Sequence, residues 1–355
     1  MSRYFTQRHR ELKVYVPGEQ PRDQQYIKLN TNESPYPPSA GVLRAAEAEA
    51  SRLQLYSDPE CTALNQKAAE VYGVSADMLL MTNGSDEILN FAFAAFGDDS
   101  HPFAFPALSY GFYPVFGQIN HVPCRPIPLK EDFTIDVEDY VNLNCNIVLA
   151  NPNAPTGLLL SLDQIERIVS TNPEAVVVID EAYIDFGGET ALPLVTKYDN
   201  LLVTRTFSKS CSLAGARLGF GAGNPELIAD LNRIKYSTNP YNVNRMTMAV
   251  GAAALEEAEY YQNNCKKIME CRGKTKEQLE KLGFFVTDSR ANFLFAAHPA
   301  LDGKALYLKL KEMGILIRHF DNPAISDYNR ITIGTPEQME ALIHAIETIQ
   351  REGLQ

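Results

Sequence analysis

Several signatures of common protein classes are missing from the sequence. It has no CxxC pair, no Walker-type GxxxxGK loop and no apolar run of the roughly 18 residues that a membrane span requires. Its first residues, MSRYFTQRHRELKVYV, lack the apolar core of a signal peptide. These absences argue against a zinc site, a P-loop nucleotide site and a membrane protein, and we expect a soluble, cytoplasmic protein.

Basic residues are scarce, and so are metal-binding patterns. The chain has 32 basic against 44 acidic residues, a formal net charge of -12, which opposes approach to a polyanion. No histidine stands at metal-ligand spacing from any of the six cysteines, which we expect to be reduced and structural. We therefore predict no nucleic-acid partner and no metal. The cysteines are Cys61, Cys124, Cys145, Cys211, Cys265 and Cys271.

What the sequence does contain is an alternation of short apolar runs and helical patterns. With 355 residues and 45% hydrophobic content, the chain is long enough for about two domains. Its middle reads NIVLANPN, SLDQIERIVS, AVVVIDEAY and NLLVTRTFSK in succession. Continuous Val/Ile/Leu runs that alternate with helices indicate the buried strands of a mostly parallel sheet. The predicted class is α/β.

Helix signals and prolines divide the chain. Ser161 and Gln164 have the form of a capping box, so a helix should run from there to about Ser170. A helical stretch from about Arg245 to Leu282 is followed by new strand candidates, NFLFAA, GILIRHF and RITIGT. We predict an N-terminal arm over residues 1–40, a large domain over 41–245 and a small domain over 246–355.

Polar residues follow the apolar runs at the strand ends, where open α/β sheets bind their ligands. After MLLM comes TNGSDEILNF, a glycine turn that opens an amphipathic helix. The free N–H groups at such a helix start form an anion site near Gly84, Ser85 and Asp86. Simple N-capping by Ser85 explains the same residues, so this motif alone does not establish a ligand.

Lys209 follows the apolar run LLVT, in the segment RTFSK. A partly desolvated amine at a strand end has a lowered pKa and can attack a carbonyl. Asp180 ends the run AVVVI, where a carboxylate is costly without a cationic partner such as the protonated ring nitrogen of a pyridine cofactor. Arg217 can bind a phosphate through two hydrogen bonds. The alternative interpretations are an exposed loop lysine and structural ion pairs.

Five motifs occur together in one order: SDPECTALNQKAAEVYG, NGSDEIL, NPNAPTG, DEAYIDF and RTFSKSCSLAGARLGF. With the arm segments YVPGEQP and LNTNESPYPP and the C-terminal GILIRHF and NRITIGT, they resemble the pyridoxal-phosphate aminotransferases of fold type I, class II, and among them the histidinol-phosphate aminotransferases. The resemblance covers nearly the whole chain. It implies a large domain with a mostly parallel sheet sandwiched by helices, a smaller α+β domain, and pyridoxal 5'-phosphate as the cofactor.

The resemblance also implies roles around the cofactor. Lys209 would carry pyridoxal phosphate as a Schiff base and move the substrate proton, while Asp180 would keep the ring nitrogen protonated. Tyr183 would hydrogen-bond the phenolic oxygen, and Tyr110 would stack on the ring. The family commonly has asparagine where this chain has Ala154, so the neighbouring Asn153 is the candidate to make that contact. The implied phosphate ligands are Ser208, Arg217, Gly84, Ser85 and Asp86.

The implied reaction joins L-histidinol phosphate and 2-oxoglutarate and gives imidazole-acetol phosphate and glutamate. Tyr56, in the Ser-Asp-Pro turn of LQLYSDPE, is implied to reach the partner's cofactor phosphate in a homodimer with shared active sites. The residues that the resemblance places at the substrate are Arg330, Arg318, Tyr15 and Asn32.

Other functions stay open at this point. A decarboxylase of a phosphorylated amino acid such as threonine phosphate, or an aminotransferase for aromatic amino acids, would share the cofactor residues. A non-catalytic binding protein is disfavoured by the intact lysine, aspartate and arginine. GFGAGN, at 219–224, lacks the third glycine of a dinucleotide fingerprint. Glutamate formation from 2-oxoglutarate would separate the transaminase from the decarboxylase.

Overall fold

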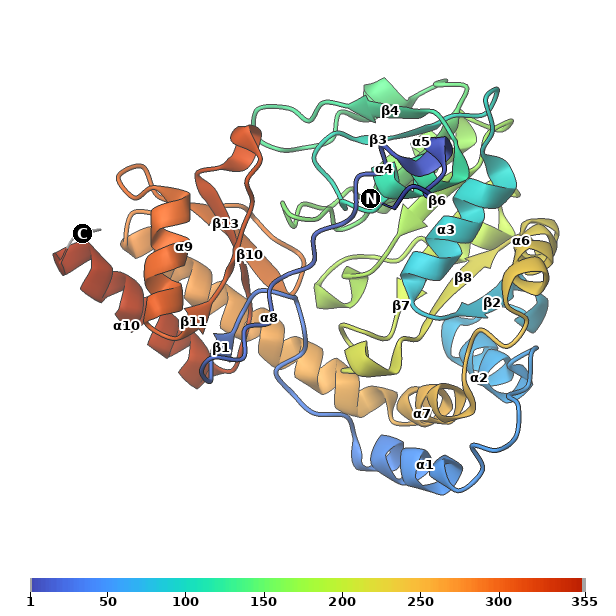
Figure 1. Cartoon of the computed structure of the whole chain (residues 1–355), viewed down its shortest axis with the longest axis horizontal. Helices are drawn as coiled ribbons and strands as arrows, with labels where there is room; N and C mark the ends of the chain where they lie inside the picture. The colour runs from blue at the N-terminus through green and yellow to red at the C-terminus, as the bar shows by residue number, and fades with distance from the viewer. Residues whose placement is uncertain (1, 353–355) are drawn as a thin grey trace.

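The computed structural model describes residues 2–352, in which a seven-stranded sheet forms the centre of the larger domain (Figure 1). β8 runs antiparallel to both of its neighbours, and the other adjacent strands pair in parallel. The predicted mostly parallel α/β sheet is confirmed. Across the sheet, the strands are β2 (Leu79–Thr82), β8 (Gly219–Gly223), β7 (Leu201–Thr206), β6 (Val177–Asp180), β5 (Asn146–Ala150), β3 (Phe103–Pro106) and β4 (Cys124–Ile127).

Helices cover both faces of this sheet because alternate strand residues point to opposite sides. In β6, Val177 and Ile179 enter one apolar cluster and Val178 enters another. α3 (Ser85–Phe96), α4 (Tyr113–Asn120) and α6 (Pro225–Thr238) contribute to the second cluster. The helices that contribute to the first are α1 (Ala40–Ala50), α2 (Thr62–Tyr72), α5 (Leu162–Ser170) and α7 (Arg245–Glu256).

The smaller domain is built on an antiparallel sheet of four strands with helices packed against it. Its core is a separate cluster of buried side chains, including Leu294, Ile331 and Leu342. This is the predicted second α+β unit. Its elements are α8 (Ala258–Lys281), β9 (Phe285–Val286), β10 (Phe293–Ala297), α9 (Gly303–Glu312), β12 (Arg318–His319), β13 (Tyr328–Thr332) and α10 (Pro336–Glu352).

Residues on either side of the start of α8 belong to different hydrophobic cores. Val250 and Ala254 of α7 belong to the core of the larger domain, and so does Tyr261 near the start of α8. Cys265 and Ile268, further along α8, belong to the core of the smaller domain. The two cores therefore change over within α8, because α7 packs on α1 and α2 rather than on the second sheet.

The N-terminal arm crosses between the domains before the chain enters α1 (Figure 1). Its strand β1 (Ile27–Lys28) pairs in parallel with β11 (Ile315–Leu316) of the smaller domain. Arg318 donates hydrogen bonds to the carbonyl oxygens of Val16 and Pro17, at 2.9 and 3.2 Å. These contacts fix the arm against the smaller domain.

Local helix signals agree closely with the structure. The capping box at Ser161 is present with both of its hydrogen bonds, and α5 ends at Ser170 as predicted. The long helical stretch forms as α7 and α8, separated at Glu257. None of the helices within residues 2–352 combines the length and the apolar character that a membrane span needs. The short 3₁₀ helices are η1 (Gln7–His9), η2 (Ala76–Met78), η3 (Val137–Tyr140), η4 (Ile184–Phe186), η5 (Leu192–Thr196), η6 (Ala214–Ala216) and η7 (Pro323–Ile325).

Candidate active site

A cavity of about 320 Å³ lies where the ends of β5, β6 and β7 meet the arm and the smaller domain. The space outside the carboxyl ends of parallel strands is where open α/β sheets bind their ligands. Most of the side chains predicted from the sequence line this one cavity. They are Tyr15, Asn32, Ser85, Asp86, Tyr110, Asp180, Tyr183, Ser208, Lys209, Arg217, Arg318 and Arg330.

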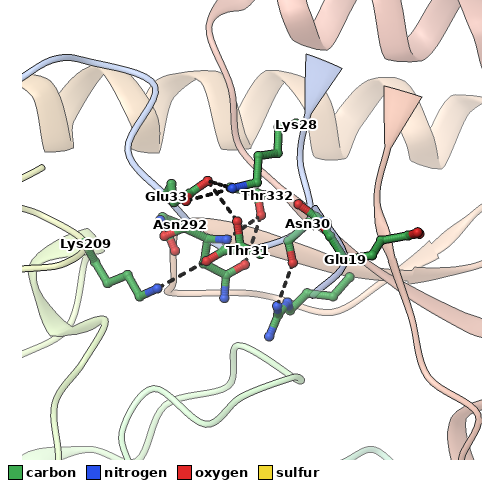
Figure 2. A network of polar contacts seen from close by, with 10 residues as sticks. Glu19, Lys28, Asn30, Thr31, Glu33, Lys209, Asn292 and Thr332 are labelled. Atoms are coloured by element: carbon green, nitrogen blue, oxygen red, sulfur yellow. Dashed lines mark hydrogen bonds and ion pairs between the residues drawn. The ribbon is translucent and has the colours of Figure 1, made fainter. Parts of the chain in front are cut away.

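Lys209 extends from the loop after β7 toward the arm (Figure 2). Its Nζ donates a hydrogen bond to the carbonyl oxygen of Thr31, at 3.2 Å. Burial, and to a smaller extent the positive charge of Arg330, lower the pKa of this amine to about 8. A sizeable fraction of the amine is therefore unprotonated near neutral pH, which is the form that attacks a carbonyl.

Asp180 is the last residue of β6 and only 4% exposed. The hydroxyls of Tyr113 and Thr204 donate hydrogen bonds to its two carboxylate oxygens, at 2.9 and 3.1 Å. Burial raises the pKa of this carboxyl to about 6, although these hydrogen bonds lower it. No lysine, arginine or histidine of the described chain forms an ion pair with Asp180, so the carboxylate is available for a cationic group in the cavity.

The start of α3 and the segment around Arg217 form a cradle suited to an anion. Gly84, the N-cap of α3, has a φ of 80°, and a Cβ at this position would lie 2.5 Å from Nη2 of Arg217. Arg217 is within 3.5 Å of the Ser208 hydroxyl and pairs with Asp86 at 3.2 Å. The unpaired N–H groups at the helix start, a hydroxyl and a guanidinium thus face one end of the cavity.

Two tyrosines complete the walls around Lys209. The hydroxyl of Tyr110 donates a hydrogen bond to Asp86 at 2.7 Å, which fixes the ring beside the cradle. The hydroxyl of Tyr183 accepts a hydrogen bond from Nδ2 of Asn32 at 2.9 Å. The rings therefore reach the cavity from two separate segments of the large domain.

Arginines mark the opposite end of the cavity, next to the arm. Arg330 lies between the rings of Phe293 and Phe320, with its guanidinium carbon 5.4 and 5.7 Å from their centres. It donates a hydrogen bond to the carbonyl oxygen of Asn30 at 3.0 Å, and burial lowers its pKa. Because few protein acceptors satisfy this guanidinium, it is suited to bind an anionic group that enters the cavity.

The structure does not bring Asn153 to the cavity. Its amide accepts a hydrogen bond from the hydroxyl of Ser109 at 2.7 Å and donates to the carbonyl of Leu108 and the hydroxyl of Thr156. Its neighbour Ala154 lines the cavity instead. The expected replacement of the usual asparagine by Asn153 therefore has no support here, because that side chain stabilises the loop itself.

Tyr56 also lies outside the cavity of its own chain. Its side chain is 79% exposed and stacks on Tyr241 at a ring distance of 4.6 Å. Gly84 has no side chain, so it contributes only backbone to the cradle, next to Arg217.

Sequence reasoning missed Tyr113 and Thr204, the hydroxyl donors to Asp180. Thr204 had a signal, because a polar residue within the buried run LLVT must find a partner, and β6–β7 pairing places it opposite Asp180. Tyr113 had none, since its contact spans two separate elements. The carbonyl of Thr31 could not be found from side-chain chemistry at all.

Comparison with known proteins agrees with this geometry. The sequence family described as aminotransferase class I and II matches residues 24–346. The chain belongs to this family. It is 48% identical over 351 residues to the histidinol-phosphate aminotransferase of Brachyspira hyodysenteriae, with 98% of this chain and 99% of that protein covered.

Comparison with solved structures confirms that this chain has fold type I. The histidinol-phosphate aminotransferase of Sinorhizobium meliloti, solved in complex with pyridoxal-5'-phosphate, superposes with a TM-score of 0.89 at 22% identity and covers 99% of both chains. The L-threonine-O-3-phosphate decarboxylase of Porphyromonas gingivalis has a TM-score of 0.80 at 22% identity, covering 92% of this chain and 99% of that one. Since both share the fold, the fold alone does not choose the reaction.

The cavity fits pyridoxal phosphate, the cofactor of this family. Lys209 offers a partly buried amine with a lowered pKa, and Asp180 offers a buried carboxylate without a cationic protein partner. Gly84 leaves open the space beside Arg217 that any side chain would fill. An aldehyde, a pyridinium nitrogen and a phosphate are the groups that these three sites suit.

Proposed function

We propose that this chain catalyses pyridoxal-phosphate-dependent transfer of the amino group of L-histidinol phosphate to 2-oxoglutarate, giving imidazole-acetol phosphate and L-glutamate, in histidine biosynthesis. The observation that carries the proposal is the cavity itself, which joins the Lys209 amine, the Asp180 carboxylate and the Arg217 cradle. Full-length relatives at 48% identity that bear this activity in their names support the choice of substrate.

The residues of the chain have distinct tasks in this reaction. Pyridoxal phosphate, when bound, supplies an electron sink for the charge that develops at the substrate Cα. Asp180 would keep its ring nitrogen protonated, and Arg217, Ser208 and the start of α3 would hold its phosphate. The Lys209 amine, with a pKa of about 8, can take the proton from the substrate Cα as a general base near neutral pH.

The far end of the cavity would recognise the substrates. Arg330 is partly buried and aromatic rings flank it, so an anion bound there would be shielded from water. We assign to it the phosphate of the donor and a carboxylate of the acceptor, which occupy the site in turn. Arg318 and Tyr15 would close this end, because Arg318 holds the arm and Tyr15 stacks on Phe112 at 4.2 Å.

The direct test is glutamate formation from histidinol phosphate and 2-oxoglutarate, with phosphothreonine and aromatic amino acids as competing donors. Lys209→Ala should lower the rate by at least about 10²- to 10⁴-fold, the range for a lost general base, and borohydride should no longer fix the cofactor covalently to the protein. Lys197→Ala is the matched control, because Lys197 is an exposed lysine paired with Glu166. Carbon dioxide release from phosphothreonine without glutamate formation would identify a decarboxylase instead.

The proposal includes a homodimer in which Tyr56 completes the partner's phosphate site. Supporting this, Tyr56 is exposed and stacks on the exposed Tyr241, and Leu53 and Leu55 of the same segment are exposed as well. A phenol hydroxyl can donate to an anion while its ring fills an apolar contact.

Mixing two inactive variants tests this sharing. If Tyr56 acts in trans, a mixed dimer of Lys209→Ala and Tyr56→Phe contains one site without defects, and part of the activity returns. The test requires that both variants are inactive alone and that the exchange of subunits is confirmed. If the mixture then stays inactive, Tyr56 serves its own chain.

We also place the protein in the cytoplasm. All six cysteines lie within the described residues and none is in a disulfide, as suits a reducing compartment. Cell fractionation with an activity assay would test the location.

A further inference from the structure

Asn32 occupies an unusual position between the two domains. It lies in the arm with a φ of 55°, a left-handed conformation that asparagine tolerates better than most residues, and is only 1% exposed. Its side chain lines the cavity, and the family resemblance implied a contact with the substrate. Its hydrogen bonds point to a different task.

The smaller domain fixes the orientation of the Asn32 amide. The backbone N–H of Asn32 donates to Oγ1 of Thr332 at 2.9 Å, and this hydroxyl donates back to Oδ1 of Asn32 at 3.0 Å. Nδ2 of Asn292 donates to the Asn32 carbonyl at 3.0 Å. Figure 2 shows Thr332 and Asn292 beside the arm segment that carries Thr31. With Oδ1 engaged by Thr332, the amide presents Nδ2, a donor, to Tyr183.

This direction determines where the Tyr183 proton can go. A tyrosine hydroxyl has one proton to donate and can also accept. Since the Tyr183 oxygen accepts from Asn32 at 2.9 Å, its own proton is not used in that bond. Within residues 2–352, no acceptor is found for this proton, and Tyr183 lines the cavity. The proton is therefore free for an acceptor inside the cavity.

We propose that Asn32, held by Thr332, is a positioning residue that turns the Tyr183 hydroxyl into an obligatory donor toward the phenolic oxygen of the cofactor. The inference rests on the proposed function. A hydrogen bond donated to an ionised oxygen favours the ionised form. Asn32 thereby lowers the pH at which the bound cofactor loses its proton, without touching the cofactor or the substrate.

The arrangement also connects the smaller domain to the cofactor. Thr332 belongs to β13 and Asn292 directly precedes β10, whereas Tyr183 follows β6 of the larger domain. A movement of the smaller domain that displaces Asn32 would release the Tyr183 proton from its fixed direction.

The experiment is a pH titration of the visible absorbance of the pyridoxal-phosphate-loaded protein in the absence of substrate. Tyr183→Phe should raise the midpoint by about one to two pH units, the size of a hydrogen bond to a charged group. Asn32→Asp should raise it by a similar amount, because a carboxylate accepts the Tyr183 proton and redirects it. Thr332→Val, which removes only the hydroxyl that orients Asn32, should give a smaller rise.

A double variant separates orientation from the added charge of the aspartate. In a Tyr183→Phe background, Asn32→Asp retains only its direct electrostatic effect, so its shift should be clearly smaller than in the wild-type background. Thr275→Val is the matched control for a lost buried threonine hydroxyl, since Thr275 lies in α8 and donates to the carbonyl of Cys271. It should leave the midpoint unchanged.

The outcomes are distinguishable. Equal shifts for Asn32→Asp in both backgrounds, or a Thr332→Val midpoint equal to that of the wild type, would overturn the inference while the proposed function stands. If wild-type protein incubated with pyridoxal phosphate and then freed of excess cofactor retains no visible absorbance, the proposed function fails and the inference fails with it. A substrate-contacting role for Asn32 would change the KM and leave the substrate-free titration unmoved, which also contradicts the inference.

Discussion

In the cofactor-free protein, the stability of Asp180→Asn relative to the wild type should increase as the pH rises. The substitution stabilises the fold in this range although it damages the active site. The reason is that Asp180 is 4% exposed and ionises without an ion-pair partner among the described residues. Asparagine has nearly the same shape and cannot ionise. The substitution thus isolates the cost of the buried negative charge.

The magnitude follows from the shift in pKa. Burial raises the pKa of Asp180 from 3.8 to about 6, a little more than two units. At about 1.4 kcal/mol for each unit, the ionised carboxylate costs the folded state about 3 kcal/mol. The folded form binds the extra proton between these two values, so the wild type loses this stability as the pH rises from about 4 to 6. The difference in unfolding free energy between Asp180→Asn and the wild type should therefore grow by about 3 kcal/mol over that window.

Urea unfolding of both cofactor-free proteins at fixed protein concentration, from pH 4 to 7.5, measures this difference. Asparagine presents an amide N–H₂ to the hydroxyl of Tyr113 or Thr204. This adds to the difference in unfolding free energy an offset that does not depend on pH. The diagnostic quantity is consequently the slope. A difference that stays flat between pH 4 and 6.5 would refute the view that burial makes the ionised Asp180 carboxylate costly to the folded state. Saturating pyridoxal phosphate should remove the slope, since a pyridinium supplies the missing cation.

Two further substitutions test the ends of the cavity. Gly84→Ala places a Cβ 2.5 Å from Arg217 and should weaken pyridoxal phosphate binding about 10- to 100-fold by fluorescence titration. Gly73→Ala is its control, because Gly73 also has a positive φ but a Cβ there would meet no atom within 4 Å. This variant should lose stability and keep its affinity for the cofactor. Arg330→Ala should raise the KM for both histidinol phosphate and 2-oxoglutarate about 10- to 100-fold and leave the visible absorbance intact. Arg233→Ala, 82% exposed at its side chain, is the control, and unchanged KM values for Arg330→Ala would remove Arg330 from the substrate site.

The sequence was most informative where local physics decides the structure. The apolar runs VVVI and LLVT are followed by Asp180 and by the polar segment that carries Lys209, so both residues could be placed at the sheet edge before any contact was known. The capping box at Ser161 likewise needs only neighbouring residues.

Long-range packing explains what the sequence could not provide. The helical pattern from 245 to 282 continues across Glu257, so nothing in it reveals that α7 packs on the larger domain and α8 leads into the smaller one. Tyr113 meets Asp180 only because α4 and β6 come together in the fold. The proposed role of Tyr56 depends on a second chain, whose surface the sequence of one chain does not describe.

Asn153 and Ala154 show how one residue in a turn can redirect a contact. Both belong to NPNAPTG, yet Asn153 turns its amide to Ser109 and Leu108 while Ala154 faces the cavity with no polar group. In the proposed site, the Tyr183 hydroxyl remains as a donor toward the phenolic oxygen, where the family resemblance implies an amide as well. A single donor controls the phenolic oxygen only if its proton has a fixed direction. The loss of the amide at Ala154 accordingly makes the bond between Asn32 and Tyr183, at 2.9 Å, more consequential in this chain.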